Sequence, residues 1–175
     1  MDTIHQPMLI RLKKTHDGVV LACLRKAGDA EIQRTGHDGF FASHDLMHYS
    51  VETTLGYNEA FFGLMASGWS FRNFTRHDDP NYRPPPPQSD LAENIVAVLS
   101  MHLRDASLND PDVLSIVTEE INRDLAASMS RSIVCPPVLT EAQIAAIYRR
   151  FDGLFRRWKA LPTGEHLELP FPPVD

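Results

Sequence analysis

The chain has 175 residues, of which 43% are hydrophobic and 23% are charged, so it is long enough and apolar enough to bury its own core. Its formal net charge is −6, with 17 lysines and arginines against 23 aspartates and glutamates. This balance argues against a general nucleic-acid binder, which needs a positive surface to displace the counterions of the phosphate backbone. We expect a single domain spanning residues 1–175.

The first third of the chain has the pattern of β-strands. Residues 8–14 alternate apolar and polar side chains, and two further runs follow at 19–25 and 30–36. Asp-Gly and Gly-Asp pairs lie between the runs, and such pairs favour tight hairpin turns. The sequence therefore predicts a three-stranded antiparallel meander over residues 8–36, whose apolar face must be covered by another element.

Residues 39–69 have the pattern of two helices. We expect the first over residues 39–55, ending at Gly56 because glycine readily adopts the left-handed conformation that terminates a helix. The second is expected over residues 59–69. Gly63 and a further glycine weaken this second helix, but small residues also allow close packing.

A proline-rich segment follows at residues 75–90. Four consecutive prolines at 84–87 cannot continue a helix and favour an extended conformation. Their PxxP pattern is also found in ligands of SH3-type domains, but we interpret the segment as a rigid surface connector.

Three further helices are predicted within residues 90–161. Ser89 or Asp90 can cap the first, and proline in its favoured first-turn position opens the second at Asp110-Pro111. The TEAQ sequence at residues 140–143 is a capping box for the third. We interpret residues 162–175 as a proline-rich tail on the surface.

Strands followed by helices, without alternation, predict an α+β fold. The expected architecture is an N-terminal three-stranded antiparallel meander followed by a bundle of about five helices.

The sequence SHDLMHYSVETTLGYNE, residues 43–59, concentrates side chains that bind metals. On a helix, His44 and His48 are neighbours one turn apart, so both imidazoles can reach one ion. Glu52 continues this stripe but lies about 12 Å from His44 along the helix axis. Because ligand bonds are only about 2 Å long, we predict that Glu52 supports a ligand or acts as the catalytic acid/base group.

Glu59 is the best additional ligand within this stretch. The LGYN sequence interrupts the helix, so a turn there can fold Glu59 back over His48. Asp45 could complete the ligand set or orient a histidine through its free ring nitrogen. The predicted metal ligands are His44, Asp45, His48 and Glu59.

The HDLMH sequence of residues 44–48, followed after ten residues by Glu59, resembles the HDxxH…E signature of the Coq4 family of ubiquinone-biosynthesis proteins. The resemblance implies metal ligands, usually taken to hold zinc, at His44, Asp45, His48 and Glu59. The family usually has one residue more before the glutamate and is largely helical, so the opening strands have no counterpart in it. By resemblance alone, a hydrophobic aromatic or prenylated substrate is implied.

Mixed imidazole and carboxylate ligands suit zinc, or iron, better than magnesium or calcium. The leading hypothesis is a metal-dependent enzyme in which a metal-bound water acts on a hydrophobic small-molecule substrate. The alternative is a non-catalytic binding or scaffold protein with a structural metal or none. In that case the histidines and acids of the helix would simply form hydrogen bonds, although no lysine or arginine occurs from Gly39 to Phe71 to balance the acids.

Other titratable residues have simpler interpretations. His102 shares an apolar stripe and is interpreted as a hydrogen-bonded core residue rather than an extra ligand. The pair His37-Asp38 precedes the site helix, where a capping role for Asp38 is favoured over a place beside the pocket. The arginine-rich segment 148–159 is interpreted as the solvent face of a helix, with an anion-binding patch as the alternative.

Cys23 and Cys135 are too few and too far apart for a disulfide framework, and we expect both to be reduced. No apolar run reaches the roughly 20 residues of a membrane helix, and the first residues lack the apolar core of a signal peptide. We therefore expect a cytoplasmic protein without a membrane span. A homo-oligomer is compatible with the sequence.

Overall fold

The structure is a computed structural model that describes residues 7–25, 30–35, 39–74, 79–102, 108–128 and 137–172. Within these ranges the strands are β1 Met8–Thr15, β2 Gly18–Arg25, β3 Ala30–Thr35 and β4 His166–Phe171. The α-helices there are α1 Gly39–Leu55, α2 Phe61–Ala66, α3 Pro87–His102, α4 Pro111–Ser128 and α5 Glu141–Ala160, with a short 3-10 helix η1 at Phe71–Phe74. The predicted α+β fold, a three-stranded meander followed by helices, is confirmed.

The four strands form an antiparallel sheet in the order β3-β2-β1-β4. Alternation along β1 and β2 directs one set of side chains toward the helices, as the hydrophobic pattern predicts. This buried set is Met8, Ile10, Leu12, Val19, Leu21 and Cys23. Gly18 closes the β1–β2 hairpin with a φ of 134°, a conformation that favours glycine.

The prediction that residues 162–175 form a surface tail is wrong for the described part of that segment. β4 pairs with β1, with Met8 opposite Phe171 and Leu12 opposite Leu167. Leu167, Leu169 and Phe171 are buried in alternation with exposed neighbours. Pro170 is tolerated because β4 is an edge strand, where a missing N–H does not interrupt the sheet.

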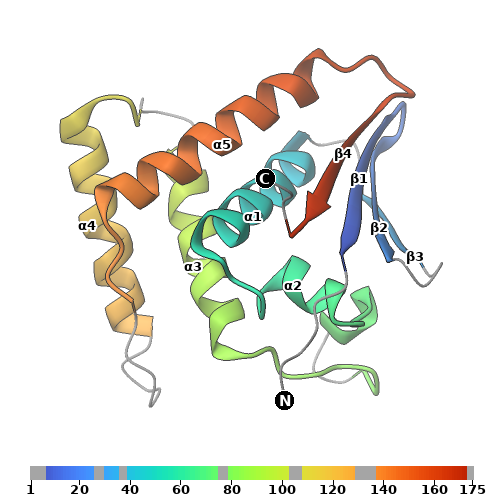
Figure 1. Cartoon of the computed structure of the whole chain (residues 1–175), viewed down its shortest axis with the longest axis horizontal. Coiled ribbons are helices and arrows are strands. Elements are labelled where there is room, and N and C mark those ends of the chain that lie inside the picture. The colour runs from blue at the N-terminus through green and yellow to red at the C-terminus, as the bar shows by residue number, and fades with distance from the viewer. Residues whose placement is uncertain are drawn as a thin grey trace.

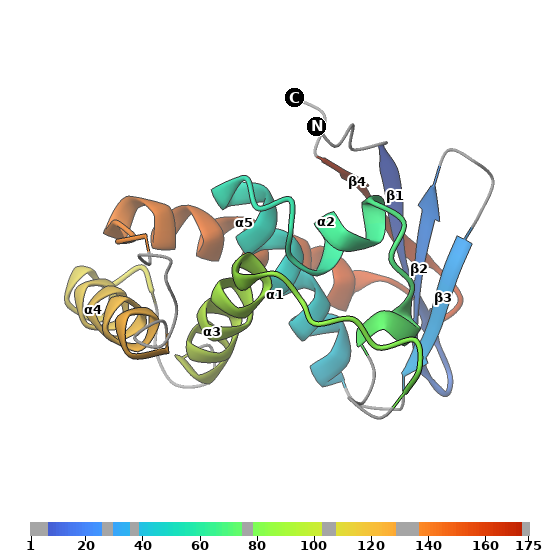
Figure 2. The ribbon, with the colours of Figure 1, turned by 90° about the horizontal axis from the view of Figure 1, so that it is seen from below.

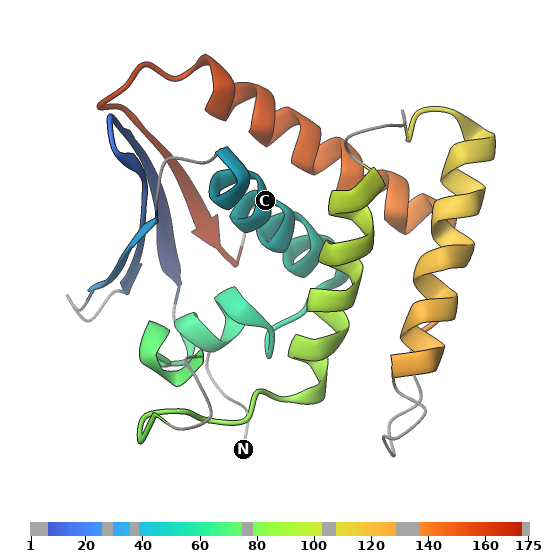
Figure 3. The same ribbon diagram turned by 180° about the vertical axis from the view of Figure 1, so that it is seen from behind.

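The helices cover one face of the sheet (Figures 1 and 2). α1 packs between α3 and α5 and also contacts α2 and β2, so it lies at the centre of the molecule. α4 lies farthest from the sheet, against α3 and α5 (Figure 3). Because α1 is surrounded, even polar side chains of its middle turns are buried, among them Ser50 and Glu52.

Several predicted helix boundaries are confirmed. α1 begins at Gly39 and ends at Leu55, as expected. Asp110 Oδ1 accepts a hydrogen bond from the backbone N–H of Asp112 at the start of α4. Thr140 and Gln143 form the predicted capping box of α5. α2 is shorter than the expected 59–69 segment, because residues 58–60 form a turn before it.

Two basic side chains tie the sheet to the ends of helices. Lys14 Nζ on β1 donates to the carbonyls of Trp158, Lys159 and Leu161 at the end of α5. Arg25 on β2 donates to the carbonyl of Met65 in the last turn of α2 and to that of Trp69 just after the helix. A cation at a helix C-terminus satisfies carbonyls that lack a partner within the helix and complements the helix dipole.

Some predictions concern residues outside the described ranges. These are the pair His37-Asp38, Cys135, and residues 75–78 of the proline-rich connector. In the part of the chain that the structure describes, no helix is long and apolar enough to cross a membrane.

Candidate metal centre

The site helix α1 places His44 and His48 one turn apart, on the side that faces α3. Their ring centroids are 4.6 Å apart, with the ring planes inclined by 60°. His48 is 2% exposed, whereas His44 is partly exposed at the edge of the site. The two imidazoles are therefore close neighbours on one face of the helix.

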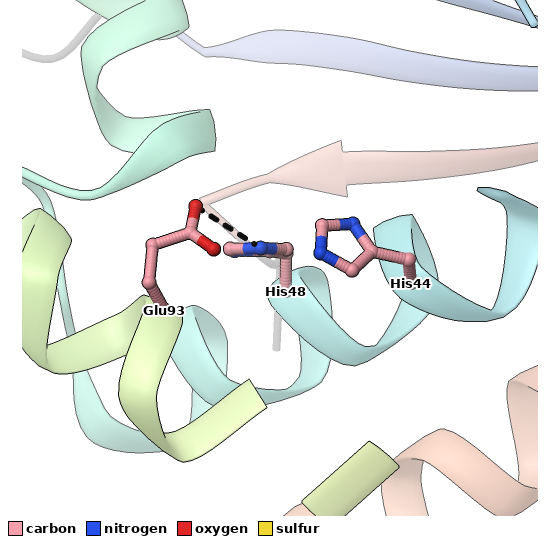
Figure 4. A group of neighbouring side chains, drawn as sticks. All are labelled: His44, His48 and Glu93. Carbon is pink, nitrogen blue, oxygen red and sulfur yellow. Dashed lines mark ion pairs between the residues drawn. The ribbon is translucent and has the colours of Figure 1, made fainter. Parts of the chain in front are cut away.

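The third member of the group comes from α3. Glu93 Oε1 lies 3.4 Å from His48 Nε2. One ligand atom from each of His44, His48 and Glu93 can be chosen so that all three lie within 4.8 Å of one another. Figure 4 shows His48 between Glu93 and His44. The Glu93 side chain is 55% exposed, so the group lies at the protein surface on one side and in the core on the other.

Glu59, predicted as a ligand, lies outside this group. It is exposed, and its backbone N–H donates to Gln88 Oε1. The chain does turn back after Gly56, which has a φ of 68°. However, α2 begins two residues after Glu59, so the turn brings the backbone of Phe62, and not the Glu59 carboxylate, toward the interior.

Asp45 also lies outside the group of three. Its Oδ1 is 3.8 Å from His44 Nδ1, which is longer than a hydrogen bond. Asp45 is therefore a neighbour of His44 and not a member of the group of three.

Glu52 lies beneath His48, one turn further along α1. Its side chain is 0% exposed, and its Oε1 is 3.6 Å from His48 Nδ1. Glu52 also accepts hydrogen bonds from the backbone N–H groups of Phe62 and Gly63 at the start of α2. Burial raises the pKa of Glu52, while His48 and these N–H groups act in the opposite direction.

His48 lies between two carboxylates, Glu52 at Nδ1 and Glu93 at Nε2. Burial disfavours the charged imidazolium, but the two carboxylates outweigh burial and raise the pKa of His48 to about 9. Burial acts to raise the pKa of Glu93 as well, yet His48 and His44 lower it overall. Without a bound ion, a protonated His48 is thus paired with the negatively charged Glu93. A metal ion that binds His48 must displace a proton from its ring.

The donor set fits a small divalent ion. Zinc bonds to imidazole nitrogen and carboxylate oxygen are about 2.0–2.1 Å, which corresponds to roughly 3.4 Å between two ligand atoms of a tetrahedron. The distance from His48 Nε2 to Glu93 Oε1 is 3.4 Å. One ligand atom of His44 lies within 4.8 Å of ligand atoms on both residues, and the His44 side chain is 35% exposed.

Sequence reasoning missed Glu93. It follows Leu91 and Ala92, which are buried, and precedes the buried Ile95, so it borders the apolar stripe of α3. That position is a weak signal, because many exposed acids border such stripes. The contact depends on α3 crossing α1, which no spacing within the sequence reveals.

His102 and the arginines of α5 lie outside the candidate metal centre. His102 Nε2 lies 2.7 Å from Glu120 Oε2, so the prediction that it is hydrogen-bonded is confirmed, although the residue is only partly buried. On α5, Arg149, Arg150, Arg156 and Arg157 are exposed, as expected of a solvent face. Arg156 pairs with Asp152 one turn before it.

In comparisons with known proteins, no protein-family model, no curated protein and no solved structure matches this chain. The function is therefore inferred from the chemistry of the site.

Proposed function

We propose that this protein binds a divalent metal ion through His44, His48 and Glu93. The observation that supports the proposal most is the meeting of three ligand atoms within 4.8 Å, from two helices far apart in the chain. Two imidazoles and one carboxylate favour zinc, with iron as the second choice. The resemblance of the HDLMH sequence to the Coq4 signature supports the two histidines, whereas the position of Glu93 replaces Glu59 as the acidic ligand.

Three protein ligands are the number found in catalytic zinc sites, where the fourth position stays open. An ion held in this way acts as a Lewis acid and lowers the pKa of a water in the open position. The exposed side of Glu93 provides access from solvent. We therefore favour a metal-dependent enzyme over a purely structural site, which would have four protein ligands.

The surroundings of the site support a hydrophobic small-molecule substrate. Phe61 packs on His48 with ring centroids 5.8 Å apart. Phe61 also contacts Phe71 and Phe74, so an aromatic cluster adjoins the ligands. Aromatic side chains beside a few convergent polar groups are typical of small-molecule sites. The alternative function is a non-catalytic binding or scaffold protein, in which the same aromatic residues serve only the core.

Metal analysis of the purified protein and two single variants tests the proposal. Glu93→Gln and Glu59→Gln each remove one carboxylate without changing side-chain size, and they separate the two possible acidic ligands. We expect about one zinc per chain in the wild type and in Glu59→Gln. In Glu93→Gln we expect zinc affinity to fall by more than the roughly 10- to 100-fold lost when only an outer partner of a ligand is removed.

Each of the other outcomes is informative. Loss of zinc from Glu59→Gln but not from Glu93→Gln would favour the ligand set predicted from the sequence. A metal-free wild type from zinc-replete medium would leave the group as an ion-pair network. Binding of acetohydroxamate to the cobalt-substituted protein, followed by its visible spectrum, distinguishes an open coordination position from a closed structural site.

A further inference from the structure

Glu52 is a buried carboxylate that contacts the candidate metal centre without belonging to it. Its side chain is 0% exposed, yet it faces no lysine or arginine in the contacts that the described residues show. A buried carboxylate is costly unless hydrogen bonds or a charge partner satisfy it. What satisfies Glu52 therefore indicates what it does.

Three N–H donors, or potential donors, surround the carboxylate. The backbone N–H of Phe62 donates to Oε2 at 2.9 Å, and that of Gly63 donates to the same oxygen at 3.1 Å. His48 Nδ1 lies 3.6 Å from Oε1, slightly beyond hydrogen-bond distance, and has no hydrogen-bond partner among the described residues. The Phe62 N–H also donates to Oε1 at 3.2 Å. Oε2 thus binds only the start of α2, whereas Oε1 lies between the start of α2 and the ring of a candidate ligand.

The backbone around Glu52 is held closely in place. The carbonyl oxygen of Glu52 accepts a hydrogen bond from the backbone N–H of Tyr57, which fixes the turn after α1. A Cβ atom at Gly63 would lie 2.2 Å from the carbonyl oxygen of Asn58, so this turn packs directly on α2. Glu52 consequently has little freedom to move toward another partner.

These contacts argue against the acid/base role considered from the sequence. A group that exchanges protons with a substrate must reach it directly or through one water. Glu52 is fully enclosed, and its oxygens are directed toward α2 and His48. The open side of the site lies instead at Glu93, beyond the opposite nitrogen of the His48 ring.

We propose that Glu52 is a positioning residue that accepts the Nδ1 hydrogen of His48 and thereby presents Nε2 to the metal. This inference depends on the proposed metal-binding function. Histidines that bind metals almost always donate their other N–H to a carboxylate, a carbonyl or a water, which fixes the tautomer and makes the ring a stronger ligand. Through its second oxygen, Glu52 also ties the position of His48 to the start of α2.

Zinc affinity, measured by competition with a chromophoric chelator, tests the role of Glu52. Glu52→Gln keeps the size of the side chain. It replaces one carboxylate oxygen by an NH₂ group, which cannot accept a hydrogen bond from Phe62, Gly63 or His48. We expect Glu52→Gln to bind zinc roughly 10- to 100-fold more weakly than the wild type. The control Glu119→Gln, an exposed change on α4, should bind zinc as the wild type does.

The result for the wild type separates the two proposals. Wild-type protein that takes up no zinc overturns the proposed function, and this inference with it. Wild-type protein that binds zinc, together with Glu52→Gln of equal affinity, overturns the positioning role alone.

A second measurement needs no variant and decides the matter if Glu52→Gln does not fold. In the long-range ¹H–¹⁵N spectrum of the zinc-loaded wild type, we expect His48 to carry its proton on Nδ1 and to bind the ion through Nε2. Metal binding through Nδ1, with the proton on Nε2, would overturn the proposal.

Discussion

At the scale of single residues, the fold makes His48 different from the other histidines that the structure describes. It is almost completely buried, and a carboxylate faces each of its ring nitrogens. The two carboxylates sit in different surroundings, since Glu52 is enclosed and Glu93 is half exposed. Because of this difference, Glu52 can fix the orientation of the His48 ring while Glu93 binds a metal ion together with it.

Cys23 is a second buried titratable residue, on the helix-facing side of β2. Burial, with a smaller contribution from the Asp45 carboxylate, raises its pKa to about 12. Because the thiolate is the reactive form, native Cys23 should not react with Ellman's reagent at pH 8, where almost none of it is deprotonated. Reactivity should rise only as the pH approaches 12 or when the protein unfolds.

The variant Cys135→Ser leaves Cys23 as the single cysteine of the chain and allows this measurement. We expect no reaction in the native state and one thiol per chain in concentrated guanidinium chloride. Rapid reaction of the native variant would show that β2 is open to solvent.

At the scale of elements, the corner between α1 and α2 depends on the absence of a side chain at residue 63. Gly63→Ala places a Cβ atom 2.2 Å from the Asn58 carbonyl oxygen, and a backbone atom cannot yield easily. We expect a loss of roughly 1–3 kcal/mol in the free energy of unfolding, the usual cost of overpacking. Urea unfolding followed by circular dichroism measures it.

Gly153 on α5 provides a matched control. It is exposed within a helix, and a Cβ atom there meets nothing within 4 Å. Gly153→Ala should therefore raise the free energy of unfolding by roughly 0.5–1 kcal/mol, because alanine favours the helix. Equal changes in the free energy of unfolding for Gly63→Ala and Gly153→Ala would contradict the close contact between residue 63 and the Asn58 carbonyl.

At the scale of the whole molecule, β4 completes the sheet beside β1, and adjacent residues of this strand have opposite environments. Leu169 is buried against the helices, whereas Glu168 is exposed and pairs with Arg11. Leu169→Ala should lower the free energy of unfolding by about 2–5 kcal/mol, the range for large-to-small changes in a core. Glu168→Gln should have little effect, because exposed ion pairs contribute little.

Urea denaturation of the two variants checks this prediction. A small effect of Leu169→Ala, comparable to that of Glu168→Gln, would mean that β4 is not part of the core.

Much of this architecture could be predicted from local patterns. The hairpins, the ends of α1, the start of α4 and the cap of α5 depend on residues close together in sequence, and the structure confirms them. β4 was missed because its prolines suggest a surface tail, while its pairing with β1 joins opposite ends of the chain.

The candidate site likewise combines contacts that local sequence predicts with contacts that only the tertiary fold creates. The proximity of His44 and His48 follows from helical spacing alone. Glu93 depends on the crossing of α1 and α3, and the environment of Glu52 depends on where α2 begins. Contacts of this kind are set by tertiary packing, which a single sequence does not encode in any short pattern.

The pairing of the last described strand with the first has a consequence for biosynthesis. β1 is synthesised before the helices α1 to α5, whereas residues 166–171 are synthesised after them. During that interval the backbone N–H and C=O groups on one side of β1 lack their final partner, and an unpaired strand edge readily accepts a foreign strand. Nascent chains of this protein should therefore be vulnerable to misassociation along β1 until β4 pairs with it.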